Sequence, residues 1–173
     1  TLISGACLHI LKEEVKGNTA LIEEYIVENK IDVATLPPAY LRLIDIENIQ
    51  DLKKLITGGD IAPVEQLRSV TKYMDYFNVY GPTESVIIAT VYVIPKGSID
   101  IPVRVPIGRP ISSIEIYITD KNSNLLPIGA VGEICIGGIG LGRGYLNKPE
   151  LTNEKFVAHP FKSKEKLYKT GDL

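Results

Sequence analysis

The stretch KKLITGGDIAPVEQLRSVTKYMDYFNVYG, residues 53–81, carries the signals that decide the fold. KKLITGG predicts a strand that ends in a glycine turn, VEQLRSV predicts a helix led by Pro63, and DYFNVYG predicts a second strand closed by Gly81-Pro82. A strand, a helix and a strand in succession form a βαβ unit, which implies parallel strands with helices on the faces of the sheet. We therefore predict an α/β fold for the first part of the chain.

The preceding residues continue the same alternation of strand and helix. Two short apolar runs predict strands, CLHI at 7–10 and DVATL at 32–36. Two stretches predict helices: the amphipathic segment that follows Asn18, and AYLRLI at 39–44, which a pair of prolines opens.

From about Thr90 the pattern changes, because strand-like runs now follow one another with turns between them. The runs are TVYVI, IEIYITD and EICIGG, and turn clusters such as KGS at 96–98 separate them. This favours an antiparallel, barrel-like subdomain, interrupted by one short helix in PELTNEKF at 149–156. The expected division is 1–92 for the α/β part and 93–173 for the β-barrel-like part.

The composition is that of a globular protein without a strong charge. Of 173 residues 45% are hydrophobic and 23% charged, and the formal net charge is −2 with the basic residues scattered. Nothing here indicates nucleic acid or an anionic membrane as a partner. Apolar runs are far shorter than the roughly 20 residues of a membrane span, and the first residues do not resemble a signal peptide, so we expect a cytoplasmic protein.

The two cysteines, Cys7 and Cys135, each lie inside an apolar run. They are far apart and have no CxxC motif or histidine-rich neighbourhood. We expect both to be small buried hydrophobic residues rather than a disulfide or a metal site.

The most informative motif is NVYGPTES at 78–85, placed where a parallel strand ends, which is where open α/β sheets bind ligands. Tyr80 offers a ring for stacking a base and Asn78 an amide for the edge of the base. Thr83 offers a hydroxyl for phosphate oxygens and Glu84 a hard oxygen ligand for Mg²⁺. The set suits a nucleoside triphosphate; the alternative is a tight turn with a capping hydroxyl, and the residues alone leave both open.

Three further stretches are weaker signals, each also compatible with a plain turn. ITGGD at 56–60 has paired glycines that let backbone approach a ligand, and the aspartate of YKTGD at 168–172 could accept both hydroxyls of a ribose. GGIGLGRGY at 137–145 is glycine-dense, but no βαβ unit surrounds it, which argues against a dinucleotide fingerprint. His9 and His159 have no partner at catalytic-triad or metal-ligand spacing, which disfavours hydrolase and metalloenzyme functions.

In chain order, ITGGD, NVYGPTE, GEICIGGIGLGRGYLNKPELTNEKF and YKTGDL resemble successive core motifs of the adenylation domains of nonribosomal peptide synthetases. These domains share a superfamily with acyl-CoA synthetases and firefly luciferase, and the long form GRGYLNKPELTNEKF is closer to the peptide synthetases. The resemblance implies a partial flavodoxin-like parallel sheet with flanking helices, followed by the β-barrel-like subdomain. It also implies that the family's small C-terminal domain is absent from this chain.

The resemblance implies ATP and Mg²⁺ as ligands and a carrier protein with a phosphopantetheine thiol as partner. Thr83 is expected at the phosphates and Glu84 at the Mg²⁺, and these two are the expected catalytic residues. An aromatic ring, an amide, two glycines and a carboxylate would hold the adenosine: Tyr80, Asn78, Gly58, Gly59 and Asp172.

Six positions match those with which the family recognises its amino acid: Thr35, Ile56, Gly58, Val79, Ile87 and Ile88. This set is mostly apolar, and an apolar pocket disfavours a charged side chain because an unpaired charge is costly to desolvate. We therefore expect a hydrophobic amino acid as substrate, attacking the α-phosphate of ATP to give aminoacyl-AMP and pyrophosphate.

By the same resemblance, the family's phosphate loop and α-amino anchor lie upstream of Thr1, and its catalytic lysine lies downstream of Leu173. We expect an internal fragment that is inactive on its own. Two alternatives stay open at this point: a non-catalytic excised or degenerate module, and an acyl-CoA or aryl-acid ligase of the same superfamily.

Overall fold

The computed structural model describes residues 2–173, which form two compact units. The first contains the residues up to Phe77 together with Ile94–Val105, and the second contains Asn78–Val93 together with Pro106–Leu173. The expected single boundary between residues 92 and 93 falls inside a strand of the structure. The assignment of these units to two subdomains of an adenylation domain stays a prediction.

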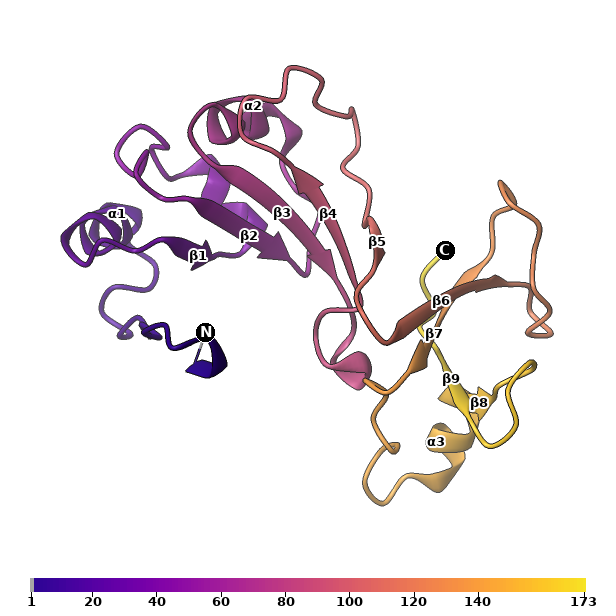
Figure 1. Ribbon diagram of the computed structural model, residues 1–173. Helices are drawn as coiled ribbons and strands as arrows, with labels where there is room; N and C mark the ends of the chain where they lie inside the picture. The colour runs from indigo at the N-terminus through magenta and orange to yellow at the C-terminus, as the bar shows by residue number, and fades with distance from the viewer. Residues whose placement is uncertain (1) are drawn as a thin grey trace. The chain divides into compact units, whose positions relative to one another are not determined.

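The first unit contains the alternating helices and strands (Figure 1). Its elements are the 3-10 helices η1 (Leu2–Ser4) and η2 (Pro38–Arg42), helices α1 (Thr19–Glu28) and α2 (Val64–Tyr73), and strands β1 (Val33–Thr35), β2 (Lys54–Gly58) and the start of β3 (Asp75–Tyr80).

Local sequence explains where the helices begin. The Asn18 side chain accepts a hydrogen bond from the Leu21 N–H at 3.4 Å and so caps α1, whose buried face includes Ile22 and Ile26. Pro63 occupies the cap position of α2, where the missing N–H and the fixed φ cost nothing. The helices predicted after Asn18 and after Pro63 are confirmed.

The first sheet has the strand order β1-β2-β3-β4-β5, with β4 at Thr90–Ile94 and β5 at Arg109–Pro110. β1 and β2 are parallel, and Thr35 lies opposite Ile56 in their register. β5 pairs with β4 in antiparallel orientation and was not predicted from the sequence. The expected α/β class is confirmed: the sheet contains the parallel pair β1 and β2, and β4 and β5 form an antiparallel pair at its other end.

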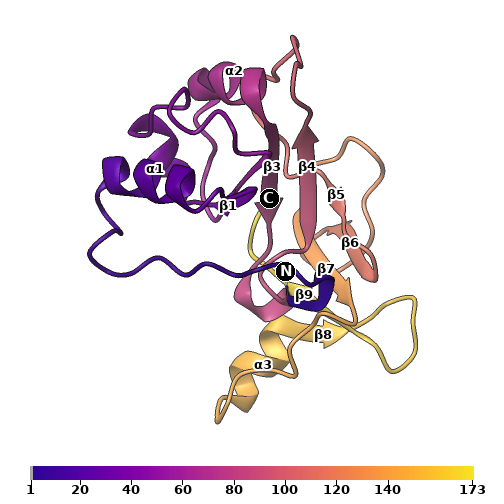
Figure 2. The same cartoon turned by 60° about the vertical axis from the view of Figure 1, so that its left-hand side comes forward.

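The second unit is built on a separate antiparallel sheet of order β6-β7-β9-β8 (Figure 2). Its elements are η3 (Thr83–Ser85), β6 (Ile114–Thr119), β7 (Glu133–Gly138), α3 (Pro149–Lys155), β8 (Phe156–Ala158) and β9 (Lys166–Lys169).

Each unit has its own apolar core. Fully buried side chains of the first unit include Leu55 on β2, Leu67 on α2 and Tyr76 on β3. In the second unit a cluster of Ala89, Ile114, Ile134 and Ile136 is buried, and Tyr80, Ile107 and Leu141 are among the side chains packed against it. Tyr80 thereby ties the end of β3 to the core of the second unit.

Two expectations for the first residues are wrong. CLHI at 7–10 forms no strand, and Cys7 is exposed rather than buried. An apolar run of four residues is too short to specify a strand without a neighbouring strand that pairs with it. Cys135, in contrast, is fully buried on β7, as expected. Between residues 2 and 173, no helix is both long enough and apolar enough to span a bilayer.

Candidate nucleotide-binding site

The loop that follows β3 is closed by its own backbone. The Ala89 N–H donates to the Tyr80 carbonyl at 2.7 Å. Gly81 is required beside this bond, because a Cβ there would lie 2.6 Å from the Ala89 nitrogen. The loop displays Thr83, which is exposed, and Glu84, which is half-buried, on the short helix η3.

Tyr80 and Asp172 are 92 positions apart in the chain and lie side by side in the second unit. The Tyr80 hydroxyl donates to Asp172 Oδ2 at 2.6 Å. The turn that carries Asp172 is attached to β7: the Ile134 N–H donates to the Asp172 carbonyl at 2.9 Å, and the Thr170 hydroxyl donates to the Ile134 carbonyl at 2.8 Å. The Tyr80 ring and the exposed Asp172 carboxylate are therefore held next to each other by this turn and its hydrogen bonds to β7.

The Tyr80 phenol stays neutral over a wide pH range. Burial raises the pKa of Tyr80 to about 12, and the hydrogen bond to Asp172 adds to this shift. The ring is half-buried and packs against the core cluster of the second unit, so it presents a rigid, uncharged surface.

The Glu84 carboxylate accepts a hydrogen bond from the Tyr145 hydroxyl at 2.6 Å. The Tyr145 oxygen also lies 3.4 Å from the Tyr168 hydroxyl. The hydrogen bond from Tyr145 is the main cause that lowers the pKa of Glu84, ahead of the opposing effect of burial. Glu84 is therefore an ionised oxygen donor at neutral pH.

Asn78 lies near the end of β3 and is almost fully buried. Its side-chain Nδ2 donates to the Pro106 carbonyl at 2.9 Å. This bond fixes which way the amide faces and leaves the side-chain oxygen as the atom that could receive an amino group.

The glycines and part of the expected amino-acid pocket lie in the first unit. Gly58 ends β2, and Gly59 follows it with a φ of +85°, a left-handed conformation that suits glycine. Thr35 and Ile56 are register partners across β1 and β2, so the structure places these two expected pocket residues next to each other.

The other three expected pocket residues lie in the second unit. Val79 is half-buried on β3, Ile88 is half-buried, and Ile87 is 69% exposed. The role of all six positions in selecting an amino acid stays a prediction.

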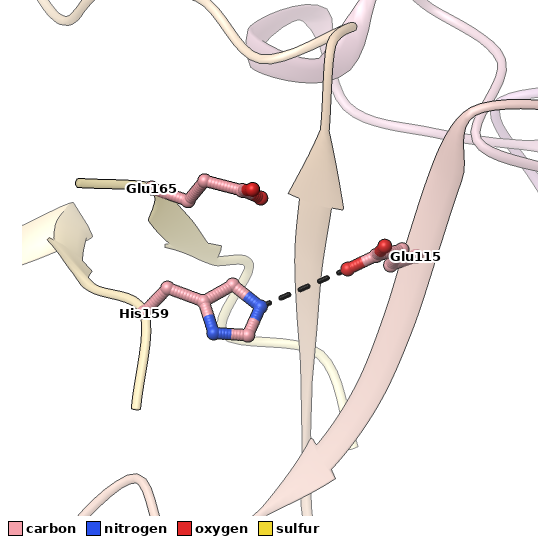
Figure 3. Close-up of side chains that lie close together, drawn as sticks. All are labelled: Glu115, His159 and Glu165. Carbon is pink, nitrogen blue, oxygen red and sulfur yellow. Dashed lines mark ion pairs between the residues drawn. The ribbon is translucent and has the colours of Figure 1, made fainter. Parts of the chain in front are cut away.

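A second polar cluster, shown in Figure 3, joins Glu115 on β6 with His159 and Glu165. His159 Nδ1 accepts hydrogen bonds from the Phe161 and Lys162 N–H groups, both at 3.1 Å. Nε2 is therefore the ring nitrogen that carries the proton, and it lies 3.7 Å from Glu115 Oε2. A metal ion would need an unprotonated Nε2 with a free lone pair. The Lys162 ammonium pairs with the same Glu115 carboxylate and supplies the positive charge, so an ion-pair network explains this cluster.

The comparisons with known proteins agree with the motifs. The family model described as AMP-binding enzyme matches residues 1–146. The chain belongs to the AMP-binding enzyme family. Tyrocidine synthase 1 of Brevibacillus parabrevis is 44% identical over 172 residues, covering 99% of this chain and 16% of that synthase. Gramicidin S synthase 1 of Brevibacillus brevis is also 44% identical, over 171 residues, covering 99% of this chain and 15% of that synthase.

Solved structures of AMP-binding enzymes share the fold. An artificially fused adenylation-PCP di-domain from Klebsiella oxytoca, NpsA-ThdA, superposes with a TM-score of 0.82 at 25% identity, covering 98% of this chain and 32% of that one. PA1221, described as an NRPS protein containing adenylation and PCP domains, has a TM-score of 0.79 in its holo form at 27% identity, covering 88% of this chain and 28% of that one. The resemblance to nonribosomal peptide synthetase adenylation domains is thereby confirmed, and the chain spans about a sixth of the first synthases it matches.

Tyr145 and Tyr168 were not predicted as site residues. The Tyr145 hydroxyl donates to Glu84, and the Tyr168 hydroxyl lies 3.4 Å from that of Tyr145. Tyr145 lies 61 positions from Glu84, and no spacing rule links a phenol to a carboxylate over that distance. The sequence offered one hint: the glycine-dense run that ends at Tyr145 did not fit a dinucleotide fingerprint and was left without a specific role.

Proposed function

We propose that this chain forms part of an adenylation domain that activates an amino acid with ATP, giving aminoacyl-AMP and pyrophosphate. The observation that carries the proposal is the hydrogen bond between the Tyr80 hydroxyl and the Asp172 carboxylate in the second unit, with Glu84 on the loop that follows Tyr80. Their relation to synthases at 44% identity supports the reaction class.

In this proposal the adenosine lies against Tyr80. The neutral ring stacks on the base, and the Asn78 side-chain oxygen accepts from the adenine amino group. Asp172 accepts hydrogen bonds from the ribose hydroxyls, for which Oδ1 is available beside the Oδ2 that Tyr80 contacts. Gly58 and Gly59 keep their proposed role of admitting the base close to the backbone.

The phosphates are proposed to meet Thr83 and Glu84. Thr83 is exposed on η3 and its hydroxyl can donate to a phosphate oxygen. Glu84 fits a Mg²⁺ ion, because it is a hard oxygen ligand that its surroundings keep ionised. Bound there, Mg²⁺ would offset the charge of the phosphates.

The amino acid is proposed to be hydrophobic and uncharged. Thr35, Ile56, Gly58, Val79, Ile87 and Ile88 offer no charged group to pair with a charged side chain. The aminoacyl group would then be transferred from AMP to a phosphopantetheine thiol on a carrier protein, with release of AMP. The matching structures that contain adenylation and PCP domains support such a partner.

The test is a pyrophosphate-exchange survey on a complete adenylation domain that contains this chain. We expect exchange with aliphatic or aromatic amino acids, lost on Glu84→Ala and on Tyr80→Ala. A clear preference for Asp, Glu, Lys or Arg would refute the pocket assignment. Exchange with aryl or fatty acids but with no amino acid would refute the reaction class.

A further inference from the structure

The glycine-dense motif at 137–145 is placed against Glu84 on two sides. The Gly142 N–H donates to the Glu84 carbonyl at 2.7 Å, and the Tyr145 hydroxyl donates to Glu84 Oε1 at 2.6 Å. Both the backbone and the side chain of Glu84 are therefore held by one nine-residue segment. No role was found for this motif from the sequence.

Small residues let the motif adopt this path. Gly144 has a φ of +140°, and a Cβ on it would lie 2.4 Å from Thr152 Cγ2 on α3. The Tyr145 N–H in turn donates to the Thr152 hydroxyl at 2.9 Å. The backbone of Tyr145 is thus hydrogen-bonded to α3, which fixes the position from which its side chain extends.

Aromatic packing fixes the rest of the Tyr145 side chain. Its ring meets the Phe156 ring edge-on, with centroids 5.7 Å apart. Phe156 also packs on Tyr168, at 5.0 Å between centroids, and both of these side chains are buried. The Tyr145 hydroxyl therefore reaches Glu84 from a rigid base and loses little entropy in making the bond.

We propose that Tyr145 is a positioning residue that orients the Glu84 carboxylate for the metal ion of the nucleotide. The inference rests on the proposed function, in which Glu84 holds that ion. The Tyr145 hydroxyl holds Oε1 of Glu84, and a carboxylate that cannot rotate freely would lose less entropy on binding an ion. Tyr145 itself touches neither metal nor nucleotide in this proposal.

Tyr145→Phe removes the hydroxyl and keeps the ring against Phe156. Tyr117→Phe is the matched control, because the Tyr117 hydroxyl also donates to a carboxylate, Glu115, at 2.8 Å in the same unit. Four variants would be made in a complete adenylation domain that contains this chain: Tyr145→Phe, Tyr117→Phe, Glu84→Gln and the double variant Glu84→Gln/Tyr145→Phe. Thermal unfolding followed by circular dichroism checks that each variant is folded.

The measurement is Mn²⁺-dependent binding of α,β-methylene-ATP, with the Mn²⁺ signal followed by electron paramagnetic resonance. For Tyr145→Phe we expect the half-saturating Mn²⁺ concentration to rise roughly three- to tenfold, the range for losing a hydrogen bond to a partly exposed charged group. Nucleotide affinity in the presence of EDTA should be almost unchanged, because Tyr145 does not touch the nucleotide in this proposal. Tyr117→Phe should match the wild type in both measurements.

The double variant separates this inference from the function on which it rests. If Tyr145 acts through Glu84, the Tyr145→Phe change has no further effect once Glu84 is Gln. If Glu84→Gln weakens Mn²⁺ binding but Tyr145→Phe does not, the positioning role is refuted and the proposed metal ligand stands. If Glu84→Gln leaves Mn²⁺ binding unchanged, the metal assignment in the proposed function is refuted and the positioning role with it. An equal loss of affinity with and without Mn²⁺ in Tyr145→Phe also overturns the inference, because it would indicate a merely structural role.

Discussion

Removing the hydroxyl of Tyr80 should change how the stability of the chain depends on alkaline pH. The phenol is neutral when protonated, and burial together with the hydrogen bond to Asp172 raises the pKa of Tyr80 from 10.0 to about 12. Below pH 10 the Tyr80 phenol is protonated in both the folded and the unfolded chain, so the Tyr80 hydroxyl makes its full contribution to the unfolding free energy. Between pH 10 and about 12 the unfolded chain loses the proton while the folded chain keeps it, and the contribution declines.

The magnitude follows from the size of the shift and the exposure of the pair. Two pKa units would correspond to about 2.7 kcal/mol if the pair were fully shielded from solvent. Tyr80 is only half-buried and Asp172 is exposed, so water screens the pair and about 1 kcal/mol is the expected contribution. Tyr80→Phe removes the hydrogen bond to Asp172 and should therefore lose about 1 kcal/mol of unfolding free energy at pH 8. This difference should almost vanish at pH 12, because the wild type has by then lost about 1 kcal/mol through the proton that its unfolded chain gives up, and phenylalanine has no such proton.

Urea unfolding of wild type and Tyr80→Phe across this pH range measures the difference, and ultraviolet titration of tyrosinate measures the pKa directly. The wild-type spectrum minus the Tyr80→Phe spectrum should show one group that titrates near pH 12. Tyr92→Phe, a change at a half-buried tyrosine on β4, serves as the control. Two results would contradict the assignment. One is a difference in unfolding free energy that stays constant from pH 8 to pH 12, and the other is a difference spectrum whose group titrates at pH 10.

Two further predictions concern the glycines of the second unit and the reactivity of the two cysteines. Gly138 has a φ of +107° and a Cβ there would lie 2.2 Å from the Ser113 carbonyl oxygen, so Gly138→Ala should cost about 3 kcal/mol in urea unfolding. Gly129→Ala, at a φ of +90° with no atom within 4 Å of the added Cβ, should cost only about 1 kcal/mol, and equal costs would show that the steric argument is wrong. Cys7 is exposed and Cys135 is fully buried, with burial raising the pKa of its thiol, so a disulfide reagent should modify one thiol in the native chain and both in urea. Rapid modification of both thiols without urea would contradict the buried position on β7.

Much of the local structure could be predicted because its determinants are neighbours in the chain. Asn18 caps the helix that begins one residue later, and Pro63 precedes the first turn of α2. The alternation in IEIYIT and EICIGG produces β6 and β7, which pair along their whole length. CLHI shows the limit: it has the composition of a strand, but no strand pairs with it in the described residues.

For the candidate site too, part could be predicted from neighbouring residues and part depended on the tertiary structure. NVYGPTE by itself suggested a nucleotide site and left a plain turn open, because an aromatic ring, an amide, a hydroxyl and a carboxylate stand together at the end of a strand. The roles of these residues stay a prediction. Only the tertiary structure decided what holds those groups in place, because hydrogen bonds and ring contacts depend on distance in space and not along the chain. It brought Asp172 to Tyr80 across 92 positions and Tyr145 to Glu84 across 61, through the pairing of β7 with β9 and the packing of Tyr145 on Phe156.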